Sequence, residues 1–222
     1  MGQSLNPKKA PLDFTVRVSE LPMSRKAERS FEKGTQLLAK GDARGSLAYF
    51  LKAVDQAPFS YRPYHNLAFA YYSLGQYDAA GENFQKSINL TGGRFAPSMF
   101  GLAAVLYRQS DFPGAERLVR EGLLLQPNSA TGKYCLGLVQ YSMGRIAEAE
   151  RSAQEALALD PDETEAYVLL GWVHDVAHNP AAELKDAQTY LKLAPNGAQK
   201  ANALEQVRRA QQALALTSTA VN

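Results

Sequence analysis

Apolar and small residues recur along this chain with the spacing of amphipathic helices, and the whole pattern repeats every 34 residues. Pro127, Pro161 and Pro195 mark this interval. In four of the five copies, a Leu-Gly or Leu-Ala pair lies in the first half. The pattern predicts five helix–turn–helix units, which cover residues 27–60, 61–94, 96–129, 130–163 and 164–197.

Each repeated position has a physical role in this prediction. Glycine or alanine at the eighth and twentieth positions lets the two helices of a unit approach closely, while larger apolar residues pack against the next unit. Gly75 and Gly144 lie where a first helix must end, a place that favours a left-handed backbone. Proline stops the second helix. Because one unit alone would leave an apolar face in water, the five must stack.

These motifs resemble the tetratricopeptide repeat family over residues 24–197. The resemblance implies an all-α solenoid, wound as a right-handed superhelix, in which the first helix of each unit lines a concave groove. It also implies that the protein is a binding or scaffolding module. The family serves many partners, so the resemblance does not identify one.

The two ends of the chain lie outside the repeats. Leu12, Phe14, Val16 and Val18 alternate with polar residues, which predicts an extended segment within an extended or disordered leader at residues 1–23. The leader could also lie along the solenoid, or it could be the end of a preceding domain. Apolar residues at helical spacing predict a capping helix over 198–216, and residues 217–222 are expected to fray.

In this family the groove-facing residues occupy the second, fifth, ninth, twelfth and thirteenth positions of each first helix. On this chain those positions hold many aromatic side chains, which give a large contact area at a low cost in conformational entropy. We therefore expect a groove for an apolar or aromatic-bearing peptide or helix. The alternative is that several of these rings only complete the packing between repeats, or cover the leader. The expected binding residues are Phe31, His65, Phe69, Tyr72, Phe100, Tyr107, Arg108, Tyr134, Tyr141 and Trp172.

One specialisation of the family is not expected here. Its chaperone adaptors hold the terminal carboxylate of a peptide with Lys and Asn residues on successive first helices. Of the corresponding early positions in this chain, only Asn66 matches.

The charge is small in total and uneven along the chain. A net charge of +2 gives no reason to expect a nucleic-acid partner. Residues 145–190 hold ten acidic and three basic residues, whereas the first sixty hold six acidic and ten basic ones. Solvated helix faces explain this asymmetry. Head-to-tail attraction would explain it too, so a structural assembly module with weak self-association is the alternative to an adaptor.

No catalytic, metal or cofactor site is predicted. Cys135, the single cysteine, is expected to be a packed thiol. His174 and His178 have the spacing of a zinc-protease helix, but His178 occupies the position where the helix ends. No apolar run approaches the ~20 residues that span a bilayer, and no signal peptide is evident. We expect a cytoplasmic protein, or a periplasmic or envelope-associated one if this is a fragment of a longer protein.

Overall fold

The computed structural model describes residues 22–219, and this part of the chain contains eleven α-helices and no strand. The expected extended segment at residues 12–18 lies outside the described residues. The helices are α1 (Arg25–Ala39), α2 (Ala43–Gln56), α3 (Tyr61–Ser73), α4 (Tyr77–Leu90), α5 (Ala96–Arg108), α6 (Phe112–Leu125), α7 (Ala130–Ser142), α8 (Ile146–Leu159), α9 (Glu165–Val176), α10 (Pro180–Leu193) and α11 (Lys200–Thr219).

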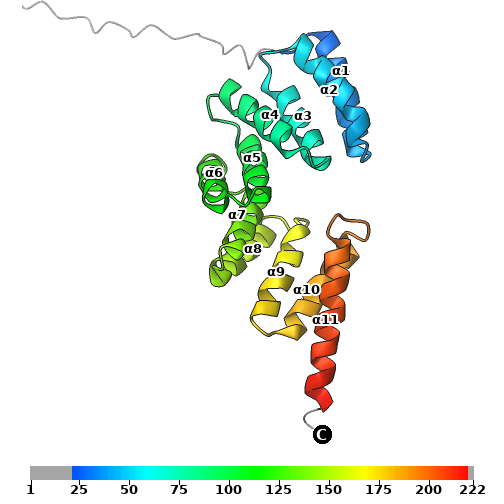
Figure 1. The fold of residues 1–222 in the computed structure, drawn as a ribbon, viewed down its shortest axis with the longest axis vertical. Coiled ribbons are helices and arrows are strands. Elements are labelled where there is room, and N and C mark those ends of the chain that lie inside the picture. Colours follow the sequence, from blue (N-terminus) through cyan, green and yellow to red (C-terminus); the bar gives the residue numbers. More distant parts are fainter. Residues whose placement is uncertain (1–21, 220–222) are drawn as a thin grey trace, which may run out of the picture.

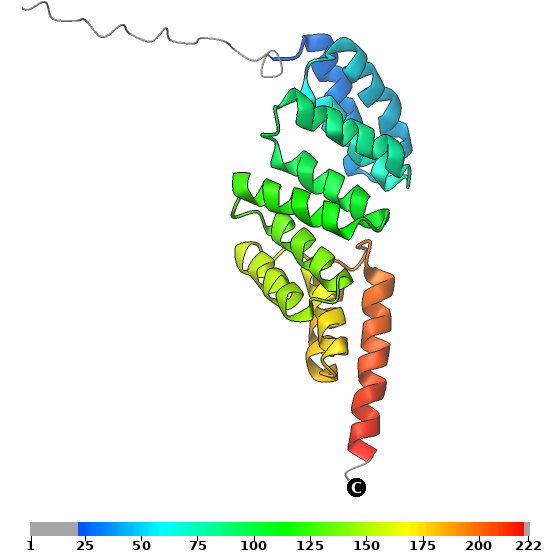
Figure 2. The same cartoon turned by 60° about the vertical axis from the view of Figure 1, so that its left-hand side comes forward.

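The helices stack in the order of the sequence into a curved solenoid (Figures 1 and 2). Each helix packs against the ones before and after it in the chain. The first helices α1, α3, α5, α7 and α9 also contact one another in succession. These additional contacts place the first helices on the inner side of the curve and the second helices on the outer side. The structure is therefore a solenoid of five helix pairs with a final helix.

The turn between the helices of each pair uses one backbone conformation. A residue with positive φ occupies the same position in all five pairs, at Gly41, Gly75, Ser110, Gly144 and His178, with φ between 54° and 81°. Glycine adopts this conformation without the steric cost that a Cβ brings. The third and fifth pairs accept a side chain at this position.

Close helix packing depends on small residues facing large rings. A Cβ built on Gly34 would lie 2.7 Å from the ring of Phe50, which is fully buried. The Phe100 ring likewise fills the space beside Gly122 and Gly132. These contacts let the helices of one pair, and of adjacent pairs, approach closely while burying whole aromatic rings.

Helix α11 closes the C-terminal end of the solenoid. It packs on both α9 and α10. The fully buried amide of Gln206 donates to the Val168 carbonyl at 2.9 Å and covers Gly171. The helix continues to Thr219, three residues beyond the end that the apolar spacing predicts. A backbone can continue helical hydrogen bonding past its last packed residue, and Thr217 helps by donating its hydroxyl to the Leu214 carbonyl at 2.8 Å.

No helix within residues 22–219 has both the length and the apolar character needed to cross a bilayer. That finding concerns only this part of the chain.

Candidate functional site

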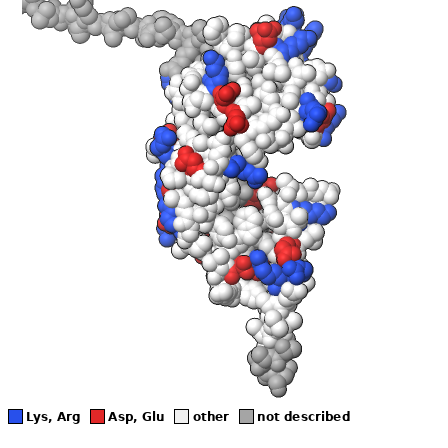
Figure 3. Space-filling view, viewed as in Figure 1, with Lys and Arg blue, Asp and Glu red and all other residues white. Residues whose placement is uncertain are grey.

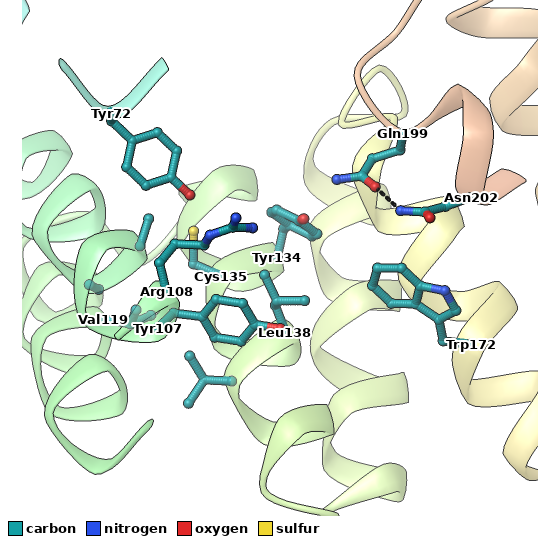
Figure 4. Close-up of a pocket in the computed structure, with 13 residues that line it drawn as sticks. Tyr72, Tyr107, Arg108, Val119, Tyr134, Cys135, Leu138, Trp172, Gln199 and Asn202 are labelled. Atoms are coloured by element: carbon teal, nitrogen blue, oxygen red, sulfur yellow. Dashed lines mark hydrogen bonds between the residues drawn. The ribbon is translucent and has the colours of Figure 1, made fainter. Parts of the chain in front are cut away.

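A cavity of about 320 Å³ lies on the inner side of the solenoid, where the first helices face one another. Its walls come from α3, α5, α6, α7, α9 and the start of α11 (Figure 4). Residues four positions apart share a helix face, so Tyr134 and Leu138 of α7 line the same wall. The space-filling view shows a largely uncharged hollow on this side of the molecule, between the N-terminal hairpins and the beginning of α11 (Figure 3).

Half of the predicted binding residues meet in this cavity. They come from four different first helices, and their rings and one guanidinium form most of its polar and aromatic lining. The residues are Tyr72 of α3, Tyr107 and Arg108 of α5, Tyr134 of α7 and Trp172 of α9. Four rings from helices well separated in sequence therefore converge on one space.

Arg108 is the single charged side chain among the described residues that line the cavity. Its guanidinium lies 5.3 Å from the centre of the Tyr77 ring, within the range of a cation–π interaction. Within residues 22–219, Arg108 forms no ion pair. Figure 4 shows its head group between the rings of Tyr72 and Tyr134. The cavity thus presents an uncompensated positive charge among aromatic walls.

Burial raises the pKa of three other titratable groups of the cavity, Tyr72, Tyr134 and Cys135. It raises the pKa of the Tyr72 hydroxyl, an effect that the nearby Arg108 charge partly opposes. Burial also raises the pKa of Tyr134 far above its usual range. The pKa of Cys135 is raised to about 12, again mainly by burial, so this residue is a thiol at neutral pH and a poor nucleophile.

Two cavity residues come from the start of the capping helix, and the repeat pattern in the sequence did not predict them as binding residues. Gln199 directly precedes α11, and Asn202 lies in its first turn. The Asn202 amide donates to the Gln199 side-chain oxygen, which leaves the Gln199 amide nitrogen pointing into the cavity (Figure 4). The backbone N–H of Gln199 donates to the Tyr190 hydroxyl at 2.8 Å and fixes this corner.

Two segments, residues 49–82 and residues 134–198, match the sequence profile of the tetratricopeptide repeat. The chain belongs to the tetratricopeptide repeat family. Proteins of this family present a concave surface formed by stacked helix pairs, and their fold supports interaction with other proteins.

Relatives in other organisms share parts of this repeat array. A protein of Methanocaldococcus jannaschii is 38% identical over 64 residues, which make up 29% of this chain and 74% of that protein. The tetratricopeptide repeat and J domain-containing co-chaperone of Cryptococcus neoformans is 26% identical over 105 residues, or 47% of this chain. The match spans only 20% of the co-chaperone's length.

Solved structures of tetratricopeptide repeat proteins have the same fold. A thermophilic member from Thermus thermophilus superposes with a TM-score of 0.71 at 24% identity, covering 85% of this chain and 98% of the other. YrrB, described as having an unusual peptide-binding site, superposes with a TM-score of 0.53 at 18% identity, covering 81% and 90%. At these identities the likeness concerns the fold alone.

Two of the residues expected in the groove are core residues of the tetratricopeptide repeats. Phe31 is 8% exposed, and Phe100 is 5% exposed. The Phe100 ring turns into the space that Gly122 and Gly132 leave free, and Phe31 packs on Phe50 with ring centres 6.1 Å apart. Both rings pack between helices because small or complementary neighbours make room for them, so neither offers its face to a partner.

His65 was expected to face the groove, but it is held in an aromatic cluster. Its ring makes edge contacts with Phe84 and Phe95, at 5.7 and 5.2 Å, and its Nδ1 lies 2.9 Å from the Ser98 hydroxyl. Phe95 covers it because the longer connection after α4 places this ring there. Burial lowers the pKa of His65 to about 4, so the imidazole is neutral at physiological pH.

The remaining two expected residues lie outside the cavity lining. Phe69 of α3 is 51% exposed. Tyr141 of α7 packs beside Trp172, with ring centres 5.9 Å apart, and burial raises the pKa of its hydroxyl. Tyr141 therefore contacts a cavity residue without lining the cavity, whereas Phe69 is exposed on the surface.

The two histidines with zinc-protease spacing do not form a common site. His174 Nδ1 lies 2.8 Å from an Asp186 oxygen, and its Nε2 lies 3.8 Å from a Glu150 oxygen. His178 adopts positive φ in the turn and is exposed. Among residues 22–219, no three histidine, cysteine or carboxylate side chains converge as metal ligands would.

Many acidic residues of the 145–190 segment have partners within the fold. The guanidinium of Arg209, in the capping helix, forms an ion pair with the buried carboxylate of Glu183, and its Nε lies 3.1 Å from an Asp175 oxygen. Burial raises the pKa of Glu183, while Arg209 acts in the opposite direction. Lys133 pairs with Glu155 at 2.6 Å. The local excess of acidic residues therefore overstates the charge that this surface offers to another molecule.

Proposed function

We propose that this protein is a non-catalytic adaptor that binds a peptide segment of a partner protein in the cavity on its concave side. The observation that carries the proposal is the convergence of Tyr72, Tyr107, Tyr134 and Trp172 from four first helices. Tyrosine and tryptophan combine apolar area with a polar tip and are the residues that most often dominate binding at protein interfaces.

The size of the cavity supports a peptide as the ligand. A volume of about 320 Å³ is at the lower end of the range for ligand pockets, which is about 300–1,000 Å³. Such a space can take one or two side chains from an extended segment or from one face of a helix. The description of YrrB as a repeat protein with a peptide-binding site supports the same use of this fold.

The chemistry of the cavity supports binding in preference to catalysis. Its thiol is protonated at neutral pH, and burial raises the pKa of Tyr72 and of Tyr134. General acid–base catalysis works best with a group whose pKa lies near the working pH. The pKa values of Cys135, Tyr72 and Tyr134 are raised away from neutrality, which favours an adaptor over an enzyme.

Selection of peptides from a random display library on the immobilised protein tests the proposal. Enriched peptides should bind the wild type in fluorescence polarisation, and Trp172→Ala and Tyr72→Ala should each weaken binding about tenfold or more. Tyr49→Ala is the matched control, because Tyr49 is an exposed tyrosine of the outer helix α2. Equal binding by all four proteins, with their helical circular-dichroism spectra intact, would exclude the cavity as the site.

A structural assembly role predicts a different result. Light scattering over a concentration series should give a constant monomer mass for an adaptor. Reversible growth that persists in Trp172→Ala would instead favour assembly through other faces.

A further inference from the structure

Arg108 is the one charged side chain among the described residues that line the cavity, whereas several other arginines of the array are paired with carboxylates. Arg62 lies 3.4 Å from Glu28, and Arg145 lies 2.6 Å from Glu116. Arg209 pairs with two carboxylates. Arg108 has only the Tyr77 ring as a partner within the described residues. Its charge is therefore available to a ligand.

The position of Arg108 suits a carboxylate. The guanidinium is planar, always charged, and presents several N–H donors that match the two oxygens of a carboxylate. The side chain is exposed on the cavity side, while the rings of Tyr72 and Tyr134 flank it (Figure 4). A ligand that covered this exposed head group against the rings would exclude water from it and so strengthen the charged hydrogen bond.

Besides Arg108, the cavity contains a second hydrogen-bond donor and an apolar wall. The Gln199 amide nitrogen points into the cavity from the side of α11 (Figure 4). Leu138 and Trp172 line an apolar part of the wall. A ligand that satisfies all of these groups carries an anionic oxygen pair beside a large apolar side chain.

We propose that the cavity recognises an aspartate or glutamate side chain adjacent to a large apolar residue in a partner's peptide segment. Arg108 binds the carboxylate, Gln199 adds a hydrogen bond, and Leu138 and Trp172 contact the apolar side chain. This inference rests on the proposed peptide-binding function and specifies the class of peptide. It concerns an acidic side chain within a segment, as distinct from a terminal carboxylate.

The test compares peptide libraries selected on the wild type, on Arg108→Gln and on Arg108→Glu. Wild-type selection should enrich Asp or Glu next to a large apolar residue. Arg108→Gln should keep the apolar preference and lose the acidic one, and Arg108→Glu should prefer Lys or Arg at that place. Arg151→Gln is the matched control, because Arg151 is an exposed arginine of the outer helix α8.

Single peptides then measure the effect directly. In fluorescence polarisation, replacing the acidic residue by its amide should weaken binding to the wild type about tenfold, the effect of losing one charged hydrogen bond, and hardly change binding to Arg108→Gln. Amidation of the peptide's own C-terminus should have little effect.

Three outcomes would overturn the inference. The first is a failure of the acidic preference to depend on Arg108. Either the wild type enriches apolar peptides with no preference for Asp or Glu, or Arg108→Gln enriches Asp or Glu as the wild type does. Both results would leave the proposed function intact. The second is binding that is lost on C-terminal amidation, which would assign Arg108 to a terminal carboxylate. The third is concentration-dependent sedimentation abolished by Arg108→Gln, which would assign the cavity to a second copy of this chain. If no peptide is enriched on any variant, the proposed function fails, and the inference fails with it.

Discussion

The backbone N–H of Gln199 donates a hydrogen bond to the hydroxyl of Tyr190 at a distance of 2.8 Å. Tyr190 is fully buried near the end of α10, and Gln199 directly precedes α11. This bond fixes the turn that carries the Gln199 side chain to the cavity. A core residue of the fifth repeat thereby helps to shape the candidate binding site.

Replacing Tyr190 by phenylalanine measures how much this hydrogen bond contributes to stability. The ring stays packed, but the Gln199 N–H loses its partner, so we expect the free energy of unfolding to fall by about 1 kcal/mol in urea denaturation. Amide hydrogen exchange at Gln199 should become faster. Tyr167→Phe is the control, because the Tyr167 hydroxyl makes no hydrogen bond within residues 22–219. Identical stability and exchange in Tyr190→Phe and the wild type would contradict this role.

The stability of the protein should depend on His65 in acid. Burial lowers the pKa of His65 to about 4 in the folded state, whereas an unfolded chain protonates histidine near the ordinary value of 6.5. Between these values the unfolded state binds more protons, so stability is present above pH 6.5 and is lost as the pH falls towards 4.

Urea denaturation of the wild type and His65→Phe over this range measures the effect. The wild type should lose up to roughly 3 kcal/mol more than the variant between pH 7 and pH 4, since one unit of pKa shift corresponds to about 1.4 kcal/mol. Above pH 7 the difference between the two proteins should be constant. Parallel losses down to pH 4 would show that His65 is not held neutral in the fold.

The turn position with positive φ offers a way to change stability without touching the cavity. Ser110 has φ of 64° and an exposed side chain, whereas Gly144 has φ of 75° at the equivalent place in the next repeat. A left-handed backbone costs a residue with a Cβ roughly 1–2 kcal/mol. Ser110→Gly should therefore stabilise the protein by about 1 kcal/mol, and Gly144→Ser should destabilise it by a similar amount. Thermal melts that shift in the same direction for both would refute this account.

The repeat architecture was predictable because its signals are local and recur in most of the five repeats. The 34-residue interval, the Leu-Gly pairs and the turn glycines each constrain a short segment. The turn at Ser110 shows the limit of this reasoning: position within the repeat, and not residue type, determines its backbone conformation.

The cavity was predictable only in part. Tyr72 and Phe100 both occupy groove-facing positions by family numbering, but only Tyr72 lines the cavity. The sequence did contain the signal that separates them, because Gly122 and Gly132 leave room for the Phe100 ring in the core. Gln199 had no such signal. Its place depends on how the chain turns between α10 and α11, which no periodic pattern determines.

Trp172 provides the most direct test of the central claim that the inner cavity binds a peptide. It is the single tryptophan of the chain, and it lines the cavity. Titrating the protein with a library-selected peptide that lacks tryptophan should change the wavelength or intensity of Trp172 emission. The change should saturate at the same peptide concentration as fluorescence polarisation of the labelled peptide. Saturable binding by polarisation with no change in Trp172 emission or in its quenching by acrylamide would contradict the account.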